Sequence, residues 1–188
     1  MRRRSSVLAC LALFSASASF LSASTFVALE SRELVAESQR VVQGRVLDLQ
    51  SFWNEDGRMI FTEATVAVDE TLVGAERATV VVRVPGGTVG DLRVEASGFP
   101  RFALGQEVIL FLSPSADGRH HRVVGHQQGH FEVVRRDDGV RLAVPQIDEG
   151  ARLLTRSGRP IDTPRSTELD AFKQAVLTLA GRPGPIVE

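Results

Sequence analysis

Residues 59–72 read MIFTEATVAVDETL, and apolar and polar side chains alternate along most of this segment. Ile60 and Val66 fall on one side of an extended chain, while Glu63 and Asp69 fall on the other, because successive residues of a strand project in opposite directions. Alternation of this period predicts a long β-strand with one buried face and one more polar face.

The segments on either side of this strand also have the pattern of strands. Residues 41–49 (VVQGRVLDL) precede it, separated by the turn-forming sequence NEDG at 54–57, and residues 79–84 (TVVVRV) follow it. Gly44 lies inside the first of these segments and marks a bend or a β-bulge. Three successive strands joined by turns are therefore expected.

Residues 107–112 (EVILFL) are apolar at successive positions, so both faces of this segment require burial. A short apolar run of this kind predicts a strand that is covered on both sides. Further short strands are predicted at residues 92–96, 131–134 and 140–144. Together these strands predict a mainly β protein, either a single antiparallel OB-like β-barrel or a β-sandwich.

Two helices are expected, one before the strands and one after them. Residues 31–38 are predicted to form a short helix with Ser31 as a capping residue. Residues 166–181 have apolar side chains at helical spacing, and Thr167 with Asp170 resembles a capping box. The fold class is thus a β-barrel or sandwich flanked by an N-terminal and a C-terminal helix.

The first residues have the features of a secretory signal peptide. A basic start (MRRR) is followed by an apolar run, and small residues (SAS) occupy positions 22–24. Residues 1–24 are therefore predicted to be removed, leaving a periplasmic or extracellular protein with no membrane span. Cys10, the single cysteine, lies in this segment. The exported chain is thus expected to have no disulfide bond, although export would permit one.

The rest of the chain is divided as follows. Residues 25–144 are predicted to form the β-barrel domain with its N-terminal helix, residues 145–165 a loop-rich connection, residues 166–181 the C-terminal helix and residues 182–188 a tail. Loss of the three arginines at positions 2–4 changes the net charge from −1 to −4. The exported chain therefore lacks the basic excess that is typical of nucleic-acid-binding proteins.

All four histidines of the chain lie in residues 118–130, GRHHRVVGHQQGH. Zinc needs three or four converging ligands, whereas neighbouring residues of a strand point to opposite faces. The segment is therefore interpreted as a polar β-hairpin, and no metal or other cofactor is expected. A metal site formed by His121, His126 and His130 is kept as the alternative.

No known catalytic pattern is present in the sequence. The glycine-rich residues 85–91 (PGGTVGD) lack the lysine of a P-loop, and the chain has no GxSxG motif. The order of the serine, histidine and aspartate residues marks no catalytic triad. The protein is accordingly expected not to be an enzyme, with a hydrolase of unrecognised site as a further alternative.

Several motifs resemble a group of uncharacterised secreted bacterial proteins. They are Phe26-Val27-x-Leu29, Val41-Val42-x-Gly44-x-Val46, Val84-Pro85-Gly86-Gly87, Gly98-x-Pro100-x-Phe102, Gly105-x-Glu107-Val108-x-Leu110-Phe111-Leu112 and Gln128-Gly129-x-Phe131. The strand pattern is also similar to OB-like barrels of the netrin-like type, as in tissue inhibitors of metalloproteinases. Those inhibitors reach the protease zinc through an N-terminal cysteine. The exported chain has none, so their inhibitory chemistry is not carried over.

These observations favour a secreted or periplasmic, non-enzymatic β-rich binding module. Its expected partner is an envelope protein, an exported protein or a glycan, held by the loops at 85–91, 97–102 and 125–130, and its oligomeric state is left open. The candidate partner-binding residues are Trp53, Gly86, Gly87, Phe99, Phe102 and Gln128.

Overall fold

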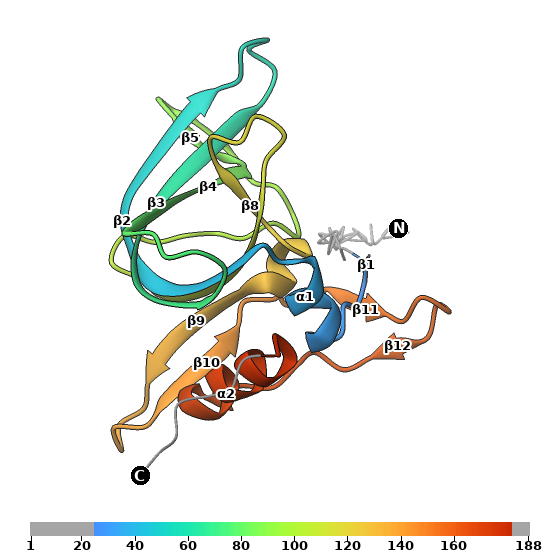
Figure 1. Ribbon diagram of the computed structural model, residues 1–188. Coiled ribbons are helices and arrows are strands. Elements are labelled where there is room, and N and C mark those ends of the chain that lie inside the picture. The colour runs from blue at the N-terminus through green and yellow to red at the C-terminus, as the bar shows by residue number, and fades with distance from the viewer. Residues whose placement is uncertain (1–24, 182–188) are drawn as a thin grey trace, which may run out of the picture.

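A computed structural model describes residues 25–181 (Figure 1). The protein is mainly β with two short helices, which confirms the predicted fold class. Its elements are β1 Thr25–Val27, α1 Ser31–Glu37, β2 Arg40–Trp53, β3 Ile60–Val73, β4 Thr79–Pro85, β5 Gly87–Val89, β6 Leu92–Val94, β7 Glu107–Pro114, β8 His121–Val123, the 3₁₀ helix η1 His126–Gly129, β9 His130–Arg135, β10 Arg141–Pro145, β11 Arg152–Leu154, β12 Pro160–Ile161, β13 Thr167–Glu168 and α2 Leu169–Leu179.

Five strands close into a barrel, which decides between the two predicted architectures. Their order is β7-β2-β3-β4-β8, and β8 pairs again with β7 to complete the ring. Neighbouring strands are antiparallel except β4 and β8, which are parallel and meet only at Val82 and His121. The barrel is therefore mixed, and its closure is its weakest pairing.

The two longest strands, β2 and β3, bend sharply, as the glycine in β2 predicted. The pairing register shifts between Gln43 and Gly44. A Cβ atom added at Gly44 would lie 2.1 Å from the carbonyl oxygen of Ala67, so a side chain there would collide with backbone. Glycine thus lets β3 approach β2 closely at the bend.

Strand β7 lies between two hydrophobic cores. Leu110 and Leu112 project into the barrel, whereas Ile109 and Phe111 project into a second core outside it. All four side chains are buried, which confirms the prediction of a strand covered on both faces. The second core is closed by the helices and contains Leu34, Val35, Val41, Leu72, Ile109, Phe111, Val124, Phe131, Val133, Ala143, Leu169 and Val176.

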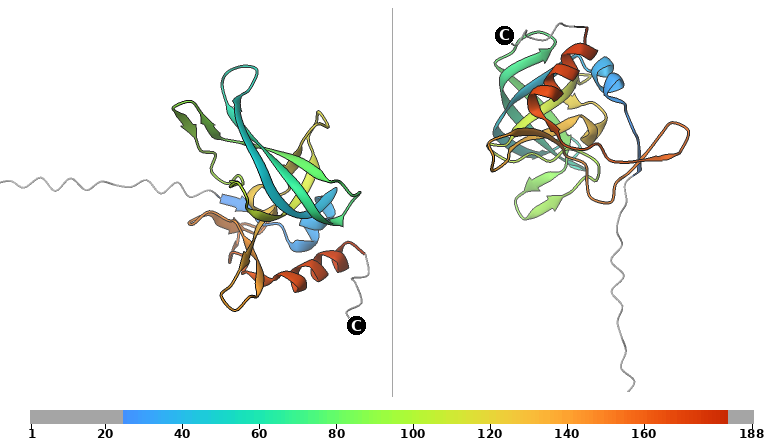
Figure 2. Two further views of the ribbon diagram at one scale, coloured as in Figure 1. Left: turned by 90° about the vertical axis from the view of Figure 1, so that its left-hand side faces the viewer. Right: turned by 90° about the horizontal axis from the view of Figure 1, so that it is seen from below.

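Both helices cover this second core from the same side (Figures 1 and 2). On α2, Phe172 packs its ring against Phe111 and Phe131, with ring centroids 6.3 and 4.6 Å apart. The predicted N-caps of both helices are wrong by one residue. Glu30, not Ser31, caps α1 and forms a capping box with Glu33, because its carboxylate reaches the backbone of the first turn. At α2 the N-cap is Glu168.

At the start of α2, the predicted capping box of Thr167 and Asp170 is absent. Thr167 belongs to β13, where it pairs with Ala143 of β10. The edge of the sheet therefore holds this threonine in an extended conformation, and the helix begins only at Leu169.

The histidine-rich residues 118–130 do not form the predicted β-hairpin. Strands β8 and β9 run in the same direction along one edge of β7 and do not pair with each other. Val123 lies opposite Leu112 and His130 opposite Leu110, so β8 and β9 are one strand interrupted by η1. Between β8 and β9 the chain leaves the edge of β7 and then rejoins it. The left-handed backbone conformations of Gly125 (φ 63°) and His126 (φ 59°) make this change of direction possible.

Residues 145–165, predicted to be mostly loop, contain a small hairpin. Strands β11 and β12 are antiparallel, and β11 pairs in parallel with β1 at the start of the described chain. This three-stranded sheet projects from the barrel (Figure 2). The predicted signal peptide (1–24) and tail (182–188) lie outside the described residues. No helix within residues 25–181 is long and apolar enough to cross a membrane.

Candidate functional site

The weak closure of the barrel leaves a gap between β4 and β8. The backbone N–H of Val124 donates to Phe111 O, and Ser115 N–H donates to His120 O. Alternate residues of a strand direct their backbone groups to opposite edges, so the N–H and C=O of Val123 point away from β7 and toward β4. In this parallel register Val84 lies opposite Val123, and the next residue of β4, Pro85, has no N–H to donate to the Val123 carbonyl. The parallel ladder accordingly consists of a single residue pair.

A groove of about 710 Å³ lies at this gap, and we call it the seam groove. Its walls come from β4, β8, η1, the N-terminal segment and the loop before β7. It is lined by Thr25, Phe26, Val27, Leu29, Glu37, Arg83, Val84, Pro85, Phe99, Pro100, Ser113, Arg122, Val123, Val124, Gly125, His126 and Gln128. Its volume is within the range of ordinary ligand sites.

Gln128 fastens the N-terminal wall of the seam groove. Its Oε1 accepts a hydrogen bond from Leu29 N at 2.9 Å, and its Nε2 donates to Val27 O at 3.0 Å. The side chain is 7% exposed. Gln128 was predicted to bind a partner, and it does line the groove. Within the chain its amide pairs with the backbone of the N-terminal segment.

Replacing Gln128 with leucine is expected to lower the free energy of unfolding by about 2 kcal/mol, because two part-buried hydrogen bonds of its buried amide are lost. Residues 25–29 should also exchange their amide hydrogens faster, which hydrogen-exchange mass spectrometry measures. Gln50→Leu is the matched control, since the Gln50 amide bonds only to the exposed Asp48. Equal stability and equal exchange in Gln128→Leu and wild type would contradict this role.

An aromatic cluster stands at one end of the seam groove. The ring of the exposed His126 lies between Phe26 and Phe99, with ring centroids 6.2 and 4.6 Å apart. Gly98 allows this arrangement, since a Cβ atom there would lie 1.9 Å from the Phe26 ring and its φ is 80°. The cluster gives the groove an apolar end with one polar edge, the imidazole of His126.

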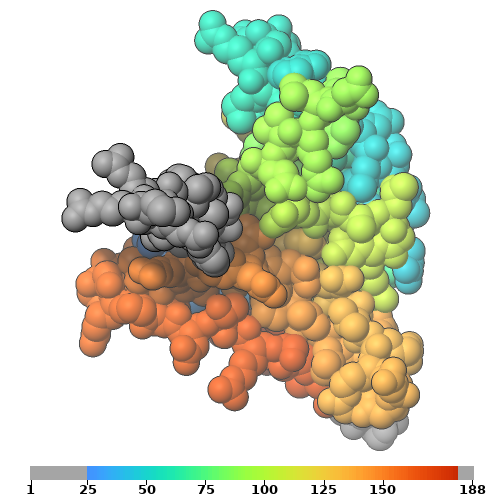
Figure 3. Space-filling view, turned by 180° about the vertical axis from the view of Figure 1, so that it is seen from behind, coloured from blue at the N-terminus to red at the C-terminus, as the bar shows by residue number. Residues whose placement is uncertain are grey.

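The loop that carries Phe99 is held in place. The Asp148 carboxylate accepts from Gly98 N at 3.2 Å and pairs with Arg101. Asp148 N in turn donates to Gln127 Oε1 at 3.1 Å. In Figure 3 the green to yellow-green segment 85–106 accordingly lies directly above the orange segment 145–165. This wall of the groove is therefore preorganised.

The charges in the seam groove are mostly positive. Arg83 pairs with Glu63 at 2.6 Å, so its charge is neutralised from outside the groove. Arg122 donates from Nε to Ser113 Oγ at 2.9 Å. Within the described part of the chain, no carboxylate forms an ion pair with Arg122. Among residues 25–181, Glu37 is the one carboxylate that lines the groove.

A second, smaller pocket of about 290 Å³ opens beside the seam groove at the mouth of the barrel. We call it the mouth pocket. Thr62 Oγ1 donates to Gly86 O at 2.7 Å and bonds to Ser51 Oγ at 2.9 Å. A Cβ atom at Gly87 would lie 2.3 Å from the same Thr62 oxygen. The two glycines thus let the chain close over the hydroxyl groups of the barrel strands.

The structure brings together most of the residues predicted from the sequence. Gly86, Gly87 and Phe102 line the mouth pocket, while Phe99 and Gln128 line the seam groove. Pro85 and Pro100 line both, so the two sites are continuous. Trp53 does not join them: it is 41% exposed and ends β2 at the tip of the β2–β3 hairpin.

The three histidines of the metal hypothesis lie in different environments. His126 is exposed on the seam groove, and His121 Nδ1 lies 3.3 Å from Val81 O at the start of β8. His130 is fully buried with its ring 4.9 Å from that of Phe102, and neither ring nitrogen has a hydrogen-bond partner. No group of three or more histidine, cysteine, aspartate or glutamate residues in the described chain is placed to hold a metal.

His130 also corrects the interpretation of this segment as a polar edge. It lies opposite Leu110, whose side chain is in the barrel, and directly opposed residues of antiparallel strands share a face. His130 therefore projects inward. Burial lowers the pKa of its imidazole to about 4. The sequence signal that could have identified it is its place beside Phe131, across from a strand that is apolar on both faces.

Comparisons with known proteins give no family for this chain. No protein-family model matches it, and no curated protein is similar to it. The resemblance to uncharacterised secreted bacterial proteins therefore stays a hypothesis, as does the likeness to netrin-like domains, whereas a β-barrel, which the strand pattern predicted, is present.

Proposed function

We propose that this protein is an exported, non-enzymatic binding module that holds an extended segment of a partner polypeptide in the seam groove. The observation that carries the proposal is the single pairing between β4 and β8. Beyond Val82 and His121 the two strands separate, and the groove occupies the space between their edges. Export rests on the signal-peptide pattern of residues 1–24.

The early end of the pairing between β4 and β8 favours a polypeptide over a small ligand. The backbone of Val123 faces β4, and Pro85 has no N–H to donate to the Val123 carbonyl. An extended peptide can supply the missing donors and acceptors by adding itself to the edge of β8, which is a common mode of peptide recognition. Alternate side chains of such a peptide would then point toward Phe99 on one side and solvent on the other.

The charge of the groove favours an acidic segment. Among residues 25–181, Arg122 has no ion-pair partner. Its guanidinium group is therefore available to bind a carboxylate of the peptide through two parallel hydrogen bonds. Glu37 on the opposite wall would repel a second carboxylate, which selects for a peptide with one acidic residue near Arg122. Glu37 is also too few for a hydrolase of the kind that uses a pair of carboxylates, so the groove gives no support to that alternative.

The test is selection of peptides against the purified protein from a library of random displayed 12-residue sequences, followed by calorimetric titration of the selected peptide. We expect peptides with an acidic residue, and we expect Arg122→Glu to weaken binding at least about tenfold, as loss of a charge-assisted contact predicts. Arg119→Glu is the matched control. It makes the same charge change three residues earlier, outside the groove.

Backbone pairing has its own measurement. N-methylation of alternate peptide bonds in the selected peptide should abolish binding in one register and leave it unchanged in the other. The amide resonance of Val123 should shift on binding. Equal affinity of the Arg122→Glu and Arg119→Glu variants would contradict the proposed site. Selection of no peptide, together with binding to immobilised glycans, would replace the polypeptide by a glycan.

A further inference from the structure

A buried arginine inside the barrel has no counter-ion. Arg40, the first residue of β2, is 7% exposed, and its Nε and Nη1 atoms are buried without a hydrogen-bond partner. It lies opposite Leu112, a barrel residue, so its side chain projects into the barrel. No carboxylate of the described chain forms an ion pair with it.

The groups around Arg40 increase the positive charge rather than balance it. Arg77, in the turn between β3 and β4, lowers the pKa of Arg40 together with burial. His121 also faces the barrel, since it pairs with the buried Val82 of β4. Burial lowers the pKa of its imidazole. The β3–β4 turn that carries Arg77 packs against Arg40, since a Cβ atom added at Gly74 in that turn would lie 3.4 Å from Arg40 Cα.

This arrangement is physically costly for the protein alone. A guanidinium group stays protonated in proteins, so Arg40 cannot become neutral as a buried lysine or histidine would. Removing a charge from water without a partner is strongly unfavourable, and neighbouring positive charges add to that cost. A bound anion would satisfy the N–H donors of Arg40 and reverse the repulsion between Arg40 and Arg77.

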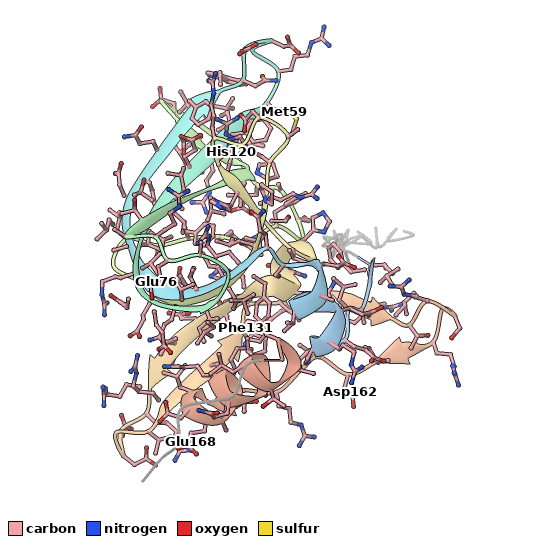
Figure 4. The ribbon with its side chains drawn as sticks, in the orientation of Figure 1. Met59, Glu76, His120, Phe131, Asp162 and Glu168 are labelled. Carbon is pink, nitrogen blue, oxygen red and sulfur yellow. The ribbon has the colours of Figure 1, made fainter. Side chains whose placement is uncertain are left out.

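We propose that the end of the barrel that contains the side chains of Arg40 and His121 and is flanked by the turn carrying Arg77 is a binding site for a tetrahedral oxyanion such as phosphate or sulfate. Arg77 is exposed in the β3–β4 turn, next to the Glu76 labelled in Figure 4, and can close over an anion from the solvent side. Arg40 supplies donors from below, and the second ring nitrogen of His121 supplies one from β8. Two permanent positive charges favour a doubly charged anion over a singly charged one.

Thermal unfolding of the purified protein at constant ionic strength tests this site. Inorganic phosphate and sulfate at ten times their Kd should raise Tm by about 4 °C relative to chloride. Acetate should bind at least about tenfold more weakly. The His121 ring resonances should shift on titration with phosphate. Because this site is separate from the seam groove, peptide binding and phosphate binding can fail independently.

Variants separate a binding site from a structural arginine. In Arg40→Met, we expect Tm without phosphate to be unchanged or higher and the phosphate effect to be lost, because an unpaired buried charge has been removed. Arg77→Gln, at an exposed position, should weaken phosphate binding about tenfold. Arg45→Met, on the same strand but paired with Glu107, is the control and should retain the phosphate effect.

Two outcomes would overturn the proposal. The first is the absence of any phosphate or sulfate effect on Tm and on the His121 resonances. The second is an equal phosphate effect in wild type, Arg40→Met and Arg77→Gln, which would place the anion elsewhere on the surface.

Discussion

Between pH 7 and pH 4 the protein is expected to lose about 3 kcal/mol of its free energy of unfolding through His130, and His130→Leu is expected to remove that loss. The cause is burial: His130 is 0% exposed, and its pKa is lowered from 6.5 to about 4. Each unit of difference between the folded and unfolded pKa corresponds to about 1.4 kcal/mol.

The sign of the effect follows from where each state takes up the proton. Above pH 6.5 the imidazole is neutral in both states, so the contribution of His130 to stability is complete and constant. As the pH falls from 6.5 to about 4, only the unfolded chain binds the proton, and stability decreases. Below pH 4 the folded protein is protonated as well, and this contribution no longer changes.

Urea unfolding of wild type and His130→Leu at several pH values between 7.5 and 4 measures this difference. At pH 7 the variant should be at least as stable, because two buried ring nitrogens without partners are replaced by apolar atoms beside Phe102. The control is His126→Asn at an exposed position, where asparagine tolerates the positive φ. The same pH slope in His130→Leu and wild type would show that another group causes the acid sensitivity.

The strands were predictable because each has a regular pattern of burial. The alternation of residues 59–72 and the apolar run at 107–112 translate directly into β3 and β7, since a strand has only two faces to cover. Gly44 was also predictable, because a glycine inside a strand often marks a close approach of two backbones. The closed barrel could not be derived in this way, since it depends on the one residue pair that joins β4 to β8.

The sequence did not reveal the surroundings of residues whose partners lie in distant parts of the chain. The composition of residues 118–130 is that of a polar hairpin. Both halves of this segment pair with β7 instead, and the pairing directs the His130 side chain into the barrel. Gln128 looks like a surface residue in the sequence, yet its partners are about 100 positions away at Val27 and Leu29. Arg40 looks like the polar start of a strand. Its burial appears only when the barrel closes around it.

The sequence predicted only some of the residues that form the candidate site. The loops at 85–91, 97–102 and 125–130 were chosen for their glycines and aromatic residues, and the structure places them around two continuous sites. Trp53 was chosen as an aromatic residue just before a turn, and it lies apart from both sites. The separation of β4 from β8 was missed, because no local pattern marks the residue at which two distant strands stop pairing.

Because β7 is shared by both cores, alanine on either of its faces is expected to destabilise the whole domain. Ile109→Ala and Leu110→Ala should each lower the free energy of unfolding by about 3–4 kcal/mol, the range for large buried aliphatic side chains. Ile109 faces the core beneath the helices and Leu110 faces the barrel, and both are 0% exposed. Leu104→Ala is the control, since Leu104 is 66% exposed and should change stability by less than about 0.5 kcal/mol.

The shape of the unfolding curve distinguishes one cooperative unit from two. If the cores were independent, Ile109→Ala would destabilise only the sheet under α1 and α2, and the barrel would unfold later at its wild-type midpoint. The backbone of β7 forms ladders with β2, β8 and β9 at the same time, so neither core can open without breaking pairs that the other needs. We therefore expect a single transition in both variants, with far-UV circular dichroism and Trp53 fluorescence changing together. Two separate transitions in Ile109→Ala would show that the barrel, with its seam groove and Arg40, is stable without the helices.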